Sequence, residues 1–362
     1  MPTSSSAHDR LQLTYIPALD GLRAIAVLLV ILYHLRGSLA GTPVAALANC
    51  GWAGVDLFFV LSGFLITRIL LAQRGQPRYF RRFYKRRALR IWPLYFGLVA
   101  VAIAYEAAHG AFRSVPWWTY LTLTQNLVVA GFGISMLRMT WSLAIEEQFY
   151  LAWPVLIRFV SRRWASLTGL AILLAEPAVR FIAARNYSLV AIYKGTPTHL
   201  DGIMMGSLLA LWVTTPAFRR RPGIALLAAA LIAGLIGTVV CIQPIDAESQ
   251  TSVFLYSWLA LLCAGLVGLC VLDALPGRSV LTFRPLCYIG TISYGLYLLH
   301  IQAFGVVGAA GSHWHVSGPL LVPVKIAAAV AIASVSWHFL ESPILKRGRP
   351  VQSPAPLEPA VV

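Results

Sequence analysis

The chain has 362 residues, of which 58% are hydrophobic and only 12% are charged, and its mean hydropathy is +0.73. Soluble domains are close to half apolar and a quarter charged, so this composition excludes an ordinary soluble enzyme and indicates a polytopic membrane protein. In a soluble protein the formal net charge of +16 would suggest a nucleic-acid partner, so the positions of the charges decide how it is interpreted.

Apolar segments long enough to cross a bilayer, allowing for tilt, follow one another along the chain. Helices are required, because backbone groups in lipid must be paired within their own segment. We therefore predict an all-α polytopic membrane bundle of about ten transmembrane helices, at residues 14–35, 51–72, 91–108, 141–159, 164–183, 197–214, 223–242, 253–272, 286–307 and 320–341.

Lysine and arginine fall mainly on the cytosolic side if the N-terminus lies in the cytosol, as the positive-inside rule requires. The basic excess is then topological, and no nucleic-acid partner is expected. We predict a cytoplasmic tail at 1–13, a membrane domain at 14–345 and a disordered cytoplasmic tail at 346–362, in a multi-pass protein of the cell membrane. The short stretch near 115–130, which polar residues interrupt, is predicted to be re-entrant or interfacial. Another span there would place the later basic clusters on the outer side of the membrane.

Two polar residues interrupt the first predicted helix. Arg23 and His34 are eleven residues apart, about 20° past three full turns, so they share one face at a separation of about 16 Å. A buried arginine costs at least about 2.5–3.5 kcal/mol and usually marks a pathway or a site. The alternative is that both side chains extend to the two membrane interfaces.

The second span carries Asp56, which we expect at the depth of His34, where a carboxylate would orient the imidazole. The alternative is an acid that stabilises a helix N-terminus. Small residues at Ser62 and Gly63, before Phe64, permit close helix approach or admit a ligand. Arg87 and Arg90 stand at i,i+3 on one helix face and suit a phosphate ligand, unless they only contact anionic lipid.

These segments resemble the acyltransferase-3 family of integral membrane acyltransferases, which O-acylate envelope sugars, exopolysaccharides and some secondary metabolites. The resemblance is carried, in family order, by "LDGLRAIAVLLVILYH", "DLFFVLSGFLIT", "RRALRIWPLY", "TWSLAIEEQFYLAWPVL", "YIGTISYGLYLLH" and "FLESPI". It extends from Leu19 to Ile344, and the ordered set is far more specific than any single piece.

The resemblance implies roles for residues at the matching positions. His34 would be the catalytic histidine, with Arg23 as its partner, while Arg87 and Arg90 would meet the acyl-CoA donor. Asp56 and the Ser62–Gly63–Phe64 turn would line the acyl path. The remaining matches, with less defined roles, are Glu146, Glu147, Tyr150 and Glu341.

The residues themselves suggest a mechanism. Arginines at the cytosolic rim would hold the phosphates of acyl-CoA, which the resemblance implies to be acetyl-CoA, while the pantetheine arm presents the thioester near His34. His34 would act as general base on an acceptor hydroxyl, with a transient acyl-histidine as the alternative. No tightly bound cofactor is expected beyond this donor substrate, and the acceptor would be a carbohydrate or a secondary metabolite.

The other polar candidates are weighed by helical spacing. Glu146 and Glu147 diverge by about 100°, so only one can face the site, and Tyr150 at i+4 favours Glu146. His300 either contacts the acceptor or is structural, and Glu341 could offset Arg23 or the Arg87–Arg90 pair. No metal site is predicted, because the outer histidines His199, His313 and His315 and the five cysteines lack ligand spacing.

Two other functions compete with acyl transfer. A transporter of an anionic or acylated small molecule would also use intramembrane Arg, His and Glu, although the chain shows no repeated pair of broken helices. A non-catalytic assembly partner would use the polar residues only to specify packing.

Overall fold

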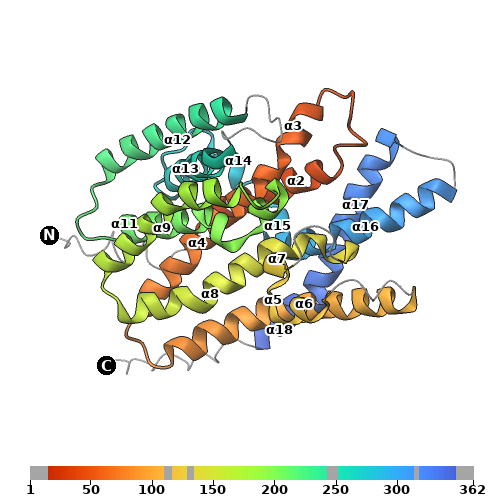
Figure 1. Ribbon diagram of the computed structural model, residues 1–362, viewed down its shortest axis with the longest axis horizontal. Coiled ribbons are helices and arrows are strands. Elements are labelled where there is room, and N and C mark those ends of the chain that lie inside the picture. Colours follow the sequence, from red (N-terminus) through yellow and green to blue (C-terminus); the bar gives the residue numbers. More distant parts are fainter. Residues whose placement is uncertain (1–14, 110–115, 129–133, 243–251, 314–317, 348–362) are drawn as a thin grey trace, which may run out of the picture.

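The computed structural model describes residues 15–109, 116–128, 134–242, 252–313 and 318–347 (Figure 1). Within these ranges the chain is helical and has no strand, which confirms the predicted all-α class. The long helices are α2 (Pro17–His34), α4 (Gly54–Gln73), α5 (Tyr79–Ala108), α8 (Trp141–Phe159), α9 (Arg162–Ala183), α11 (Asp201–Val213), α12 (Arg220–Ile242), α13 (Ser252–Val271), α16 (Ser293–His313) and α17 (Val322–Ser336).

Short helices connect or extend these elements. They are α3 (Ala45–Cys50), η1 (Gly51–Ala53), α6 (Trp118–Thr122), α7 (Gln125–Val128), η3 (Ser135–Thr140), α10 (Leu189–Lys194), η4 (Thr196–Thr198), α14 (Arg278–Leu281), α15 (Arg284–Thr291), η5 (Gly318–Leu321), the π-helical η6 (Trp337–Glu341) and α18 (Ser342–Arg347). The tails 1–13 and 348–362 lie outside the described residues, so the boundaries proposed for them stay predictions.

Eight helical segments in the described ranges are long and apolar enough to cross a membrane, which confirms a multi-pass membrane protein. Two helices at predicted spans are not among these eight. Helix α8 carries Glu146, Glu147 and Arg158, and α11 has only 13 residues. Both still form at the predicted positions and pack inside the bundle.

Helix α5 begins at Tyr79 rather than near residue 91. Arginine and lysine are good helix formers, and here the basic stretch is amphipathic. Tyr79 and Phe83 are buried, whereas the outward face is exposed at Arg81, Arg82, Lys85 and Arg86. The basic hinge is therefore the first part of one continuous helix.

The stretch predicted to be interfacial forms the helices α6 and α7, of five and four residues. At about 1.5 Å per residue neither can cross a bilayer. Trp118 is 51% exposed, as expected for an aromatic residue at a membrane interface. Within residues 116–128 the prediction of a non-spanning segment is confirmed.

The basic connections gather at one end of the bundle (Figure 1). The α4–α5, α8–α9 and α11–α12 connections lie at the left of the view. Arg74, Arg162 and Arg220 belong to these connections or to the helix starts that follow them. This clustering is what the positive-inside rule requires, and the cytosolic location of this end remains a prediction.

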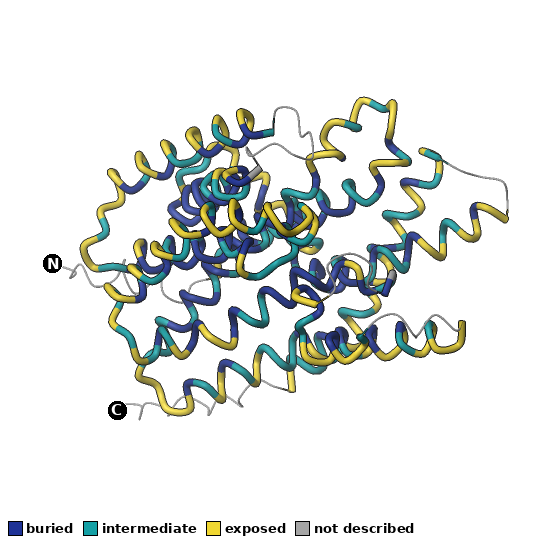
Figure 2. Tube along the Cα trace, viewed as in Figure 1, coloured by how far each residue is buried: buried dark blue, intermediate teal, exposed yellow. Residues whose placement is uncertain are grey.

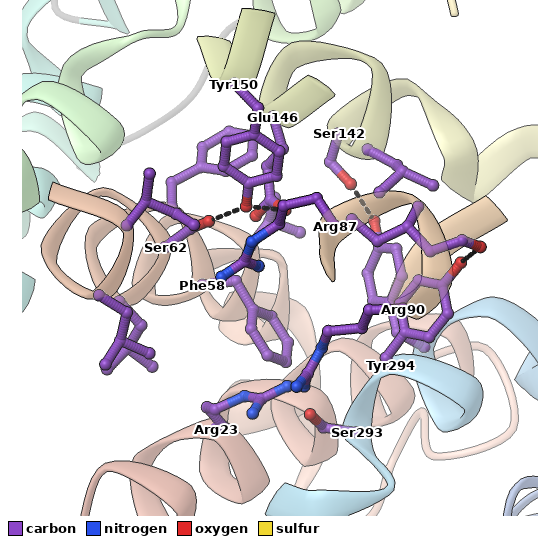
Figure 3. A pocket seen from close by; sticks show the side chains of 18 of the residues that line it. Arg23, Phe58, Ser62, Arg87, Arg90, Ser142, Glu146, Tyr150, Ser293 and Tyr294 are labelled. Atoms are coloured by element: carbon purple, nitrogen blue, oxygen red, sulfur yellow. Dashed lines mark hydrogen bonds between the residues drawn. The ribbon is translucent and has the colours of Figure 1, made fainter. Parts of the chain in front are cut away.

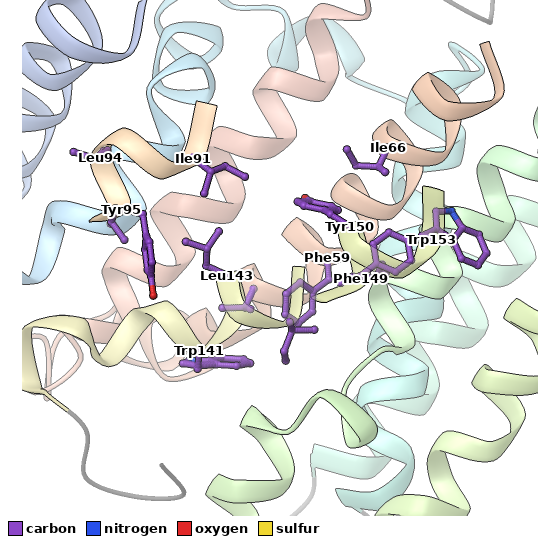
Figure 4. Packing of buried hydrophobic residues seen from close by; sticks show 14 of the residues in the cluster. Phe59, Ile66, Ile91, Leu94, Tyr95, Trp141, Leu143, Phe149, Tyr150 and Trp153 are labelled. Atoms are coloured by element: carbon purple, nitrogen blue, oxygen red, sulfur yellow. The ribbon is translucent and has the colours of Figure 1, made fainter. Parts of the chain in front are cut away.

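Helix α4 is the most deeply buried of the long spans and contacts α2, α8, α11 and α13 (Figure 2). It can approach α11 closely because Gly63 has no side chain. A Cβ at this position would lie 2.0 Å from the Ile203 carbonyl oxygen. Large side chains from α4, α5 and α8 form a shared hydrophobic cluster, with Phe59, Tyr95 and Trp153 among its members (Figure 4). These contacts fix the helices that carry the polar residues.

A buried ion network ties α9, α11 and α13 together. The Arg180 side chain is 1% exposed and contacts the carboxylates of Asp201 at 2.5 Å and Glu176 at 3.2 Å. It also donates to the Ser257 hydroxyl at 2.7 Å and to the Val253 carbonyl oxygen at 2.6 Å. Because the Arg180 guanidinium donates from all three of its nitrogens, it holds this part of the bundle together.

Candidate active site

A cavity of about 260 Å³ lies where α2, α4, α5, α8 and α16 meet (Figure 3). The side chains that α4 contributes to its lining are apolar except for Ser62. Each of the five helices contributes at least one polar side chain. The polar lining residues are Arg23, Ser62, Arg87, Arg90, Ser142, Glu146, Tyr150, Ser293, Tyr294 and Tyr297. The structure therefore brings together six residues singled out from the sequence: Arg23, Ser62, Arg87, Arg90, Glu146 and Tyr150.

Three arginines enter this cavity from two helices. Arg23 lies 3.7 Å from Asp20, and the Arg87 guanidinium stands 5.3 Å from the centre of the Tyr150 ring. Neither Arg87 nor Arg90 forms an ion pair within 4 Å in the described part of the chain. Their N–H groups are therefore available to an anionic ligand.

Glu146 faces the cavity and Glu147 does not line it, as the helical spacing predicts. Tyr150 Oη donates to Glu146 Oε2 at 2.9 Å, so the short hydrogen bond between Ser62 and Tyr150 is donated by the serine hydroxyl. Glu147 instead accepts from Trp92 Nε1 at 3.3 Å. Ser62, Tyr150 and Glu146 thus form a directed hydrogen-bond chain along the wall.

Only Ser62 of the Ser62–Gly63–Phe64 turn lines the cavity. Gly63 faces the α11 backbone, and Phe64 is 1% exposed within a hydrophobic cluster on the α11 and α13 side. Of the three residues expected to line the acyl path, the structure places only Ser62 in the lining of this cavity, because successive residues of a helix point in different directions.

Glu341 lies behind the cavity rather than in its lining. Its Oε1 accepts a hydrogen bond from the Ser336 hydroxyl at 2.9 Å. The same oxygen lies so close to Gly295 that a Cβ there would be 2.8 Å away. Its charge interacts with those of Arg90 and Arg23. This placement agrees with the predicted role of Glu341 as a counter-charge to the arginines.

His34 pairs with His300, a contact between residues 266 positions apart. His34 Nδ1 lies 2.7 Å from the Val30 carbonyl oxygen and 3.3 Å from His300 Nε2. Because a carbonyl can only accept, His34 Nδ1 carries the proton and its Nε2 keeps a free lone pair. His300 Nδ1 likewise donates to the Tyr297 carbonyl oxygen at 2.8 Å, which leaves its Nε2 as an acceptor for His34.

Tyr297 lines the cavity and also packs against His300, and we call Tyr297 together with the two lining residues that contact it, Phe58 and Ser142, the barrier. Tyr297 lines the cavity, and its ring lies 6.2 Å from that of His300 and 6.0 Å from that of Phe58. Its hydroxyl is 2.6 Å from Ser142 Oγ and donates to the Met139 carbonyl oxygen at 3.0 Å. His34 itself does not line the cavity.

Asp56 has a different partner from the one expected. Its Oδ1 lies 2.9 Å from His199 Nε2, and both side chains are fully buried. The rings of Phe59, Trp141, Tyr193 and Tyr256 surround His199. The predicted pairing of Asp56 with His34 is therefore wrong, because Asp56 points toward α11 and its preceding turn instead of toward α2.

The sequence analysis missed four polar residues of the cavity lining, Ser142, Ser293, Tyr294 and Tyr297. Ser293, Tyr297 and His300 follow one another at i, i+4 and i+7 in "SYGLYLLH", a spacing that places them on one helix face. That pattern could have indicated that α16 contributes a polar face to the site as well as a terminal histidine.

The chain is similar in sequence to known membrane acyltransferases. A family profile described as an acyltransferase domain matches residues 16–338. The chain is 32% identical over 370 residues to the peptidoglycan O-acetyltransferase OatA of Listeria monocytogenes, an alignment that covers 92% of this chain and 56% of that protein. No solved structure matches the chain.

Two further relatives show the same extent of similarity. The O-acetyltransferase OatA of Staphylococcus aureus is 30% identical, with 92% of this chain and 58% of that protein covered. The putative peptidoglycan O-acetyltransferase YrhL of Bacillus subtilis is 31% identical, with 92% and 55% covered. The chain thus spans a little over half the length of these relatives, and the profile match over most of its own length shows that it belongs to the acyltransferase-3 family.

Proposed function

We propose that this protein is a membrane O-acyltransferase that moves an acyl group, in the first instance acetyl, from cytosolic acyl-CoA to a hydroxyl of a cell-envelope carbohydrate. The observation that carries the proposal is the arginine-lined cavity, whose lining residue Tyr297 packs against His300, the partner of the His34 imidazole with its free Nε2. The family supports acyl transfer, and the names of the relatives suggest peptidoglycan as the acceptor to be tried first.

In the proposed reaction the arginines hold the phosphates of the donor and its thin pantetheine arm extends toward the barrier. The barrier has to open for the thioester to meet His34, through rotation of the Tyr297 and Phe58 side chains. His34 Nε2 takes the proton of the acceptor hydroxyl while the oxygen attacks the acyl carbon. The carbon–sulfur bond then breaks, and the imidazolium returns the proton to the leaving CoA sulfur.

Removal of both α5 arginines is expected to weaken donor binding. Arg87→Ala together with Arg90→Ala should raise the Kd for CoA about a hundredfold or more, because each guanidinium supplies charge-assisted hydrogen bonds to phosphate. Isothermal titration calorimetry of the purified protein measures the affinity. Arg86→Ala is the matched control, since Arg86 lies on the same helix but is exposed. Unchanged affinity in the double variant would contradict the phosphate role.

His300 is expected to act as a positioning residue for His34. His300→Phe removes the acceptor at 3.3 Å from His34 Nδ1 and should lower kcat about tenfold to a hundredfold with little change in the donor KM. His300→Gln, whose side-chain oxygen can still accept, should restore most of the rate. A purely structural role would instead lower thermal stability equally in both variants and leave no difference in kcat between them.

The function itself is tested by incubating purified protein with labelled acetyl-CoA and a panel of envelope glycans, beginning with peptidoglycan fragments. Mass spectrometry should show acetyl groups on hydroxyls of one glycan class. Saturable uptake of an anionic or acylated molecule into protein-containing vesicles, with no glycan labelled, would favour the transporter alternative instead.

A further inference from the structure

Three cations gather at the end of the bundle opposite the basic connections. Arg36 stands two residues after the end of α2, Arg138 lies in η3 directly before α8, and Lys194 ends α10. Because α8 and α11 end at the basic connections, the segments before them lie at the opposite end (Figure 1). The positive-inside rule leaves few cations on that side of the membrane, so a group of them there suggests a ligand.

Arg36 is held in position beside His34. Its Nη1 donates to the Tyr33 carbonyl oxygen at 2.9 Å, and its guanidinium carbon lies 4.1 Å from the centre of the Tyr33 ring. The same ring makes a T-shaped contact with the His34 ring, with 5.3 Å between the two centres. The exposed guanidinium is therefore already oriented, and it keeps further N–H groups that can donate to a ligand.

Arg138 is carried by a short element that is bonded to α16 on both sides of His300. Tyr297 Oη donates to the carbonyl oxygen of the residue after Arg138 at 3.0 Å. Gln302 Nε2 donates to the carbonyl oxygen of the residue two positions before Arg138 at 2.6 Å. These two hydrogen bonds fix η3 against the helix that presents His300 to His34, while the Arg138 side chain itself is exposed.

The two arginines act on the same imidazole and lack an acid of their own. The charges of Arg36 and Arg138 both reach His34, and that of Arg138 also reaches Lys194. Neither arginine lies within 4 Å of any carboxylate that the structure describes. Two cations oppose the positive charge that His34 would gain on taking a proton. A negative group brought by the substrate would offset both of them.

We propose that Arg36 and Arg138 bind an anionic group of the acceptor, so that the substrate class is a glycan with a carboxylate or a phosphodiester close to the hydroxyl that is acylated. This selectivity rests on the proposed function for the reaction at His34, which by itself requires only a hydroxyl. A neutral glycan would offer the same hydroxyl but would leave both guanidinium groups unpaired beside the reacting imidazole. The charged acceptor is therefore preferred.

The test compares two acceptors that differ only in charge. Purified protein in phosphatidylcholine nanodiscs receives labelled acetyl-CoA and a peptidoglycan disaccharide with a free lactyl carboxylate, or the same disaccharide with that carboxylate converted to an amide. The KM of the wild type should be about tenfold lower for the carboxylate, because guanidinium groups bind an anion more strongly than a neutral amide.

Substitutions assign the preference to the two arginines. Arg36→Gln together with Arg138→Gln should raise the KM of the carboxylate about tenfold and leave that of the amide unchanged, which also shows that the protein is folded. Arg138→Glu should make the amide the better acceptor. Arg185→Gln is the matched control, because Arg185 is exposed just after α9 at the same end of the bundle. A double variant that keeps the wild-type ratio of KM values would overturn the assignment.

A second pair of acceptors distinguishes the two kinds of anion. A glycan with a phosphodiester is compared with its dephosphorylated form, and a preference in either pair that the double variant abolishes supports the proposal. Phosphatidylglycerol added to the nanodiscs tests a lipid headgroup as the ligand. If it raises the thermal unfolding temperature of wild type but not of the double variant, while both members of each pair have equal KM values, the arginines bind lipid and the proposal is overturned.

The same assays separate this inference from the proposed function. Equal transfer to charged and neutral acceptors, or label on a neutral glycan alone, would overturn the anionic substrate class and leave acyl transfer in place. Label on no glycan at all would overturn both.

Discussion

Replacing His34 with alanine is expected to abolish acyl transfer, lowering the rate by about 10³-fold or more while the protein still folds. A positioned general base contributes a factor of about 10² to 10⁴ to such reactions, and the His34 imidazole at the end of α2 is paired with that of His300. The rate is measured as label passed from acetyl-CoA to the glycan, and folding as the thermal unfolding temperature.

His109→Ala is the matched control for that experiment. Like His34, His109 uses Nδ1 to bond the carbonyl oxygen four residues earlier, at 2.8 Å from Tyr105, but it lies exposed at the end of α5. It should keep the wild-type rate. A His34→Ala protein with full activity would remove His34 from the chemistry.

Replacing Arg180 with alanine is expected to cost about 3–5 kcal/mol of unfolding free energy, the cost typical of breaking a buried ion pair. Asp201 and Glu176 would both lose their cationic partner and Ser257 would lose a donor, and the two carboxylate side chains are no more than 3% exposed. Because the network joins α9, α11 and α13, the loss should appear as a large fall in thermal unfolding temperature and in the yield of folded protein.

Arg185→Ala is the control for Arg180. Arg185 follows the same helix and is exposed, and its guanidinium lies 5.0 Å from the centre of the Phe181 ring. Its removal should leave the unfolding temperature close to that of wild type. Equal effects of the two substitutions would show that the Arg180 network does not stabilise the bundle.

The positions of the helices follow directly from the sequence, because the apolar runs and the clusters of basic residues are local features. The bundle class, the non-spanning segment near 115–130 and the inward direction of Glu146 could all be predicted. The start of α5 could not be predicted, because a hydropathy pattern places the end of a helix at the first cluster of charged residues. The exposed face of Arg81, Arg82, Lys85 and Arg86 lets the helix continue through them.

Partners across the bundle were much harder to predict. His34 and His300, Asp56 and His199, and Arg180 and Asp201 are far apart in sequence, and their contacts depend on which helices become neighbours. A single sequence indicates how deep a residue lies in the membrane, but it does not indicate which residue of another helix lies beside it. Asp56 and His34 illustrate this point, because they were expected to meet and instead face different helices.

In the proposed mechanism a thioester delivered at the basic end of the bundle reacts at an imidazole near the opposite end. Proteoliposomes holding the protein in one determined orientation test it directly, with labelled acetyl-CoA on one side and peptidoglycan fragments on the other. Label should reach the glycan only when acetyl-CoA faces the end that carries the α4–α5 connection. Transfer that requires donor and glycan on the same side of the membrane would contradict the account.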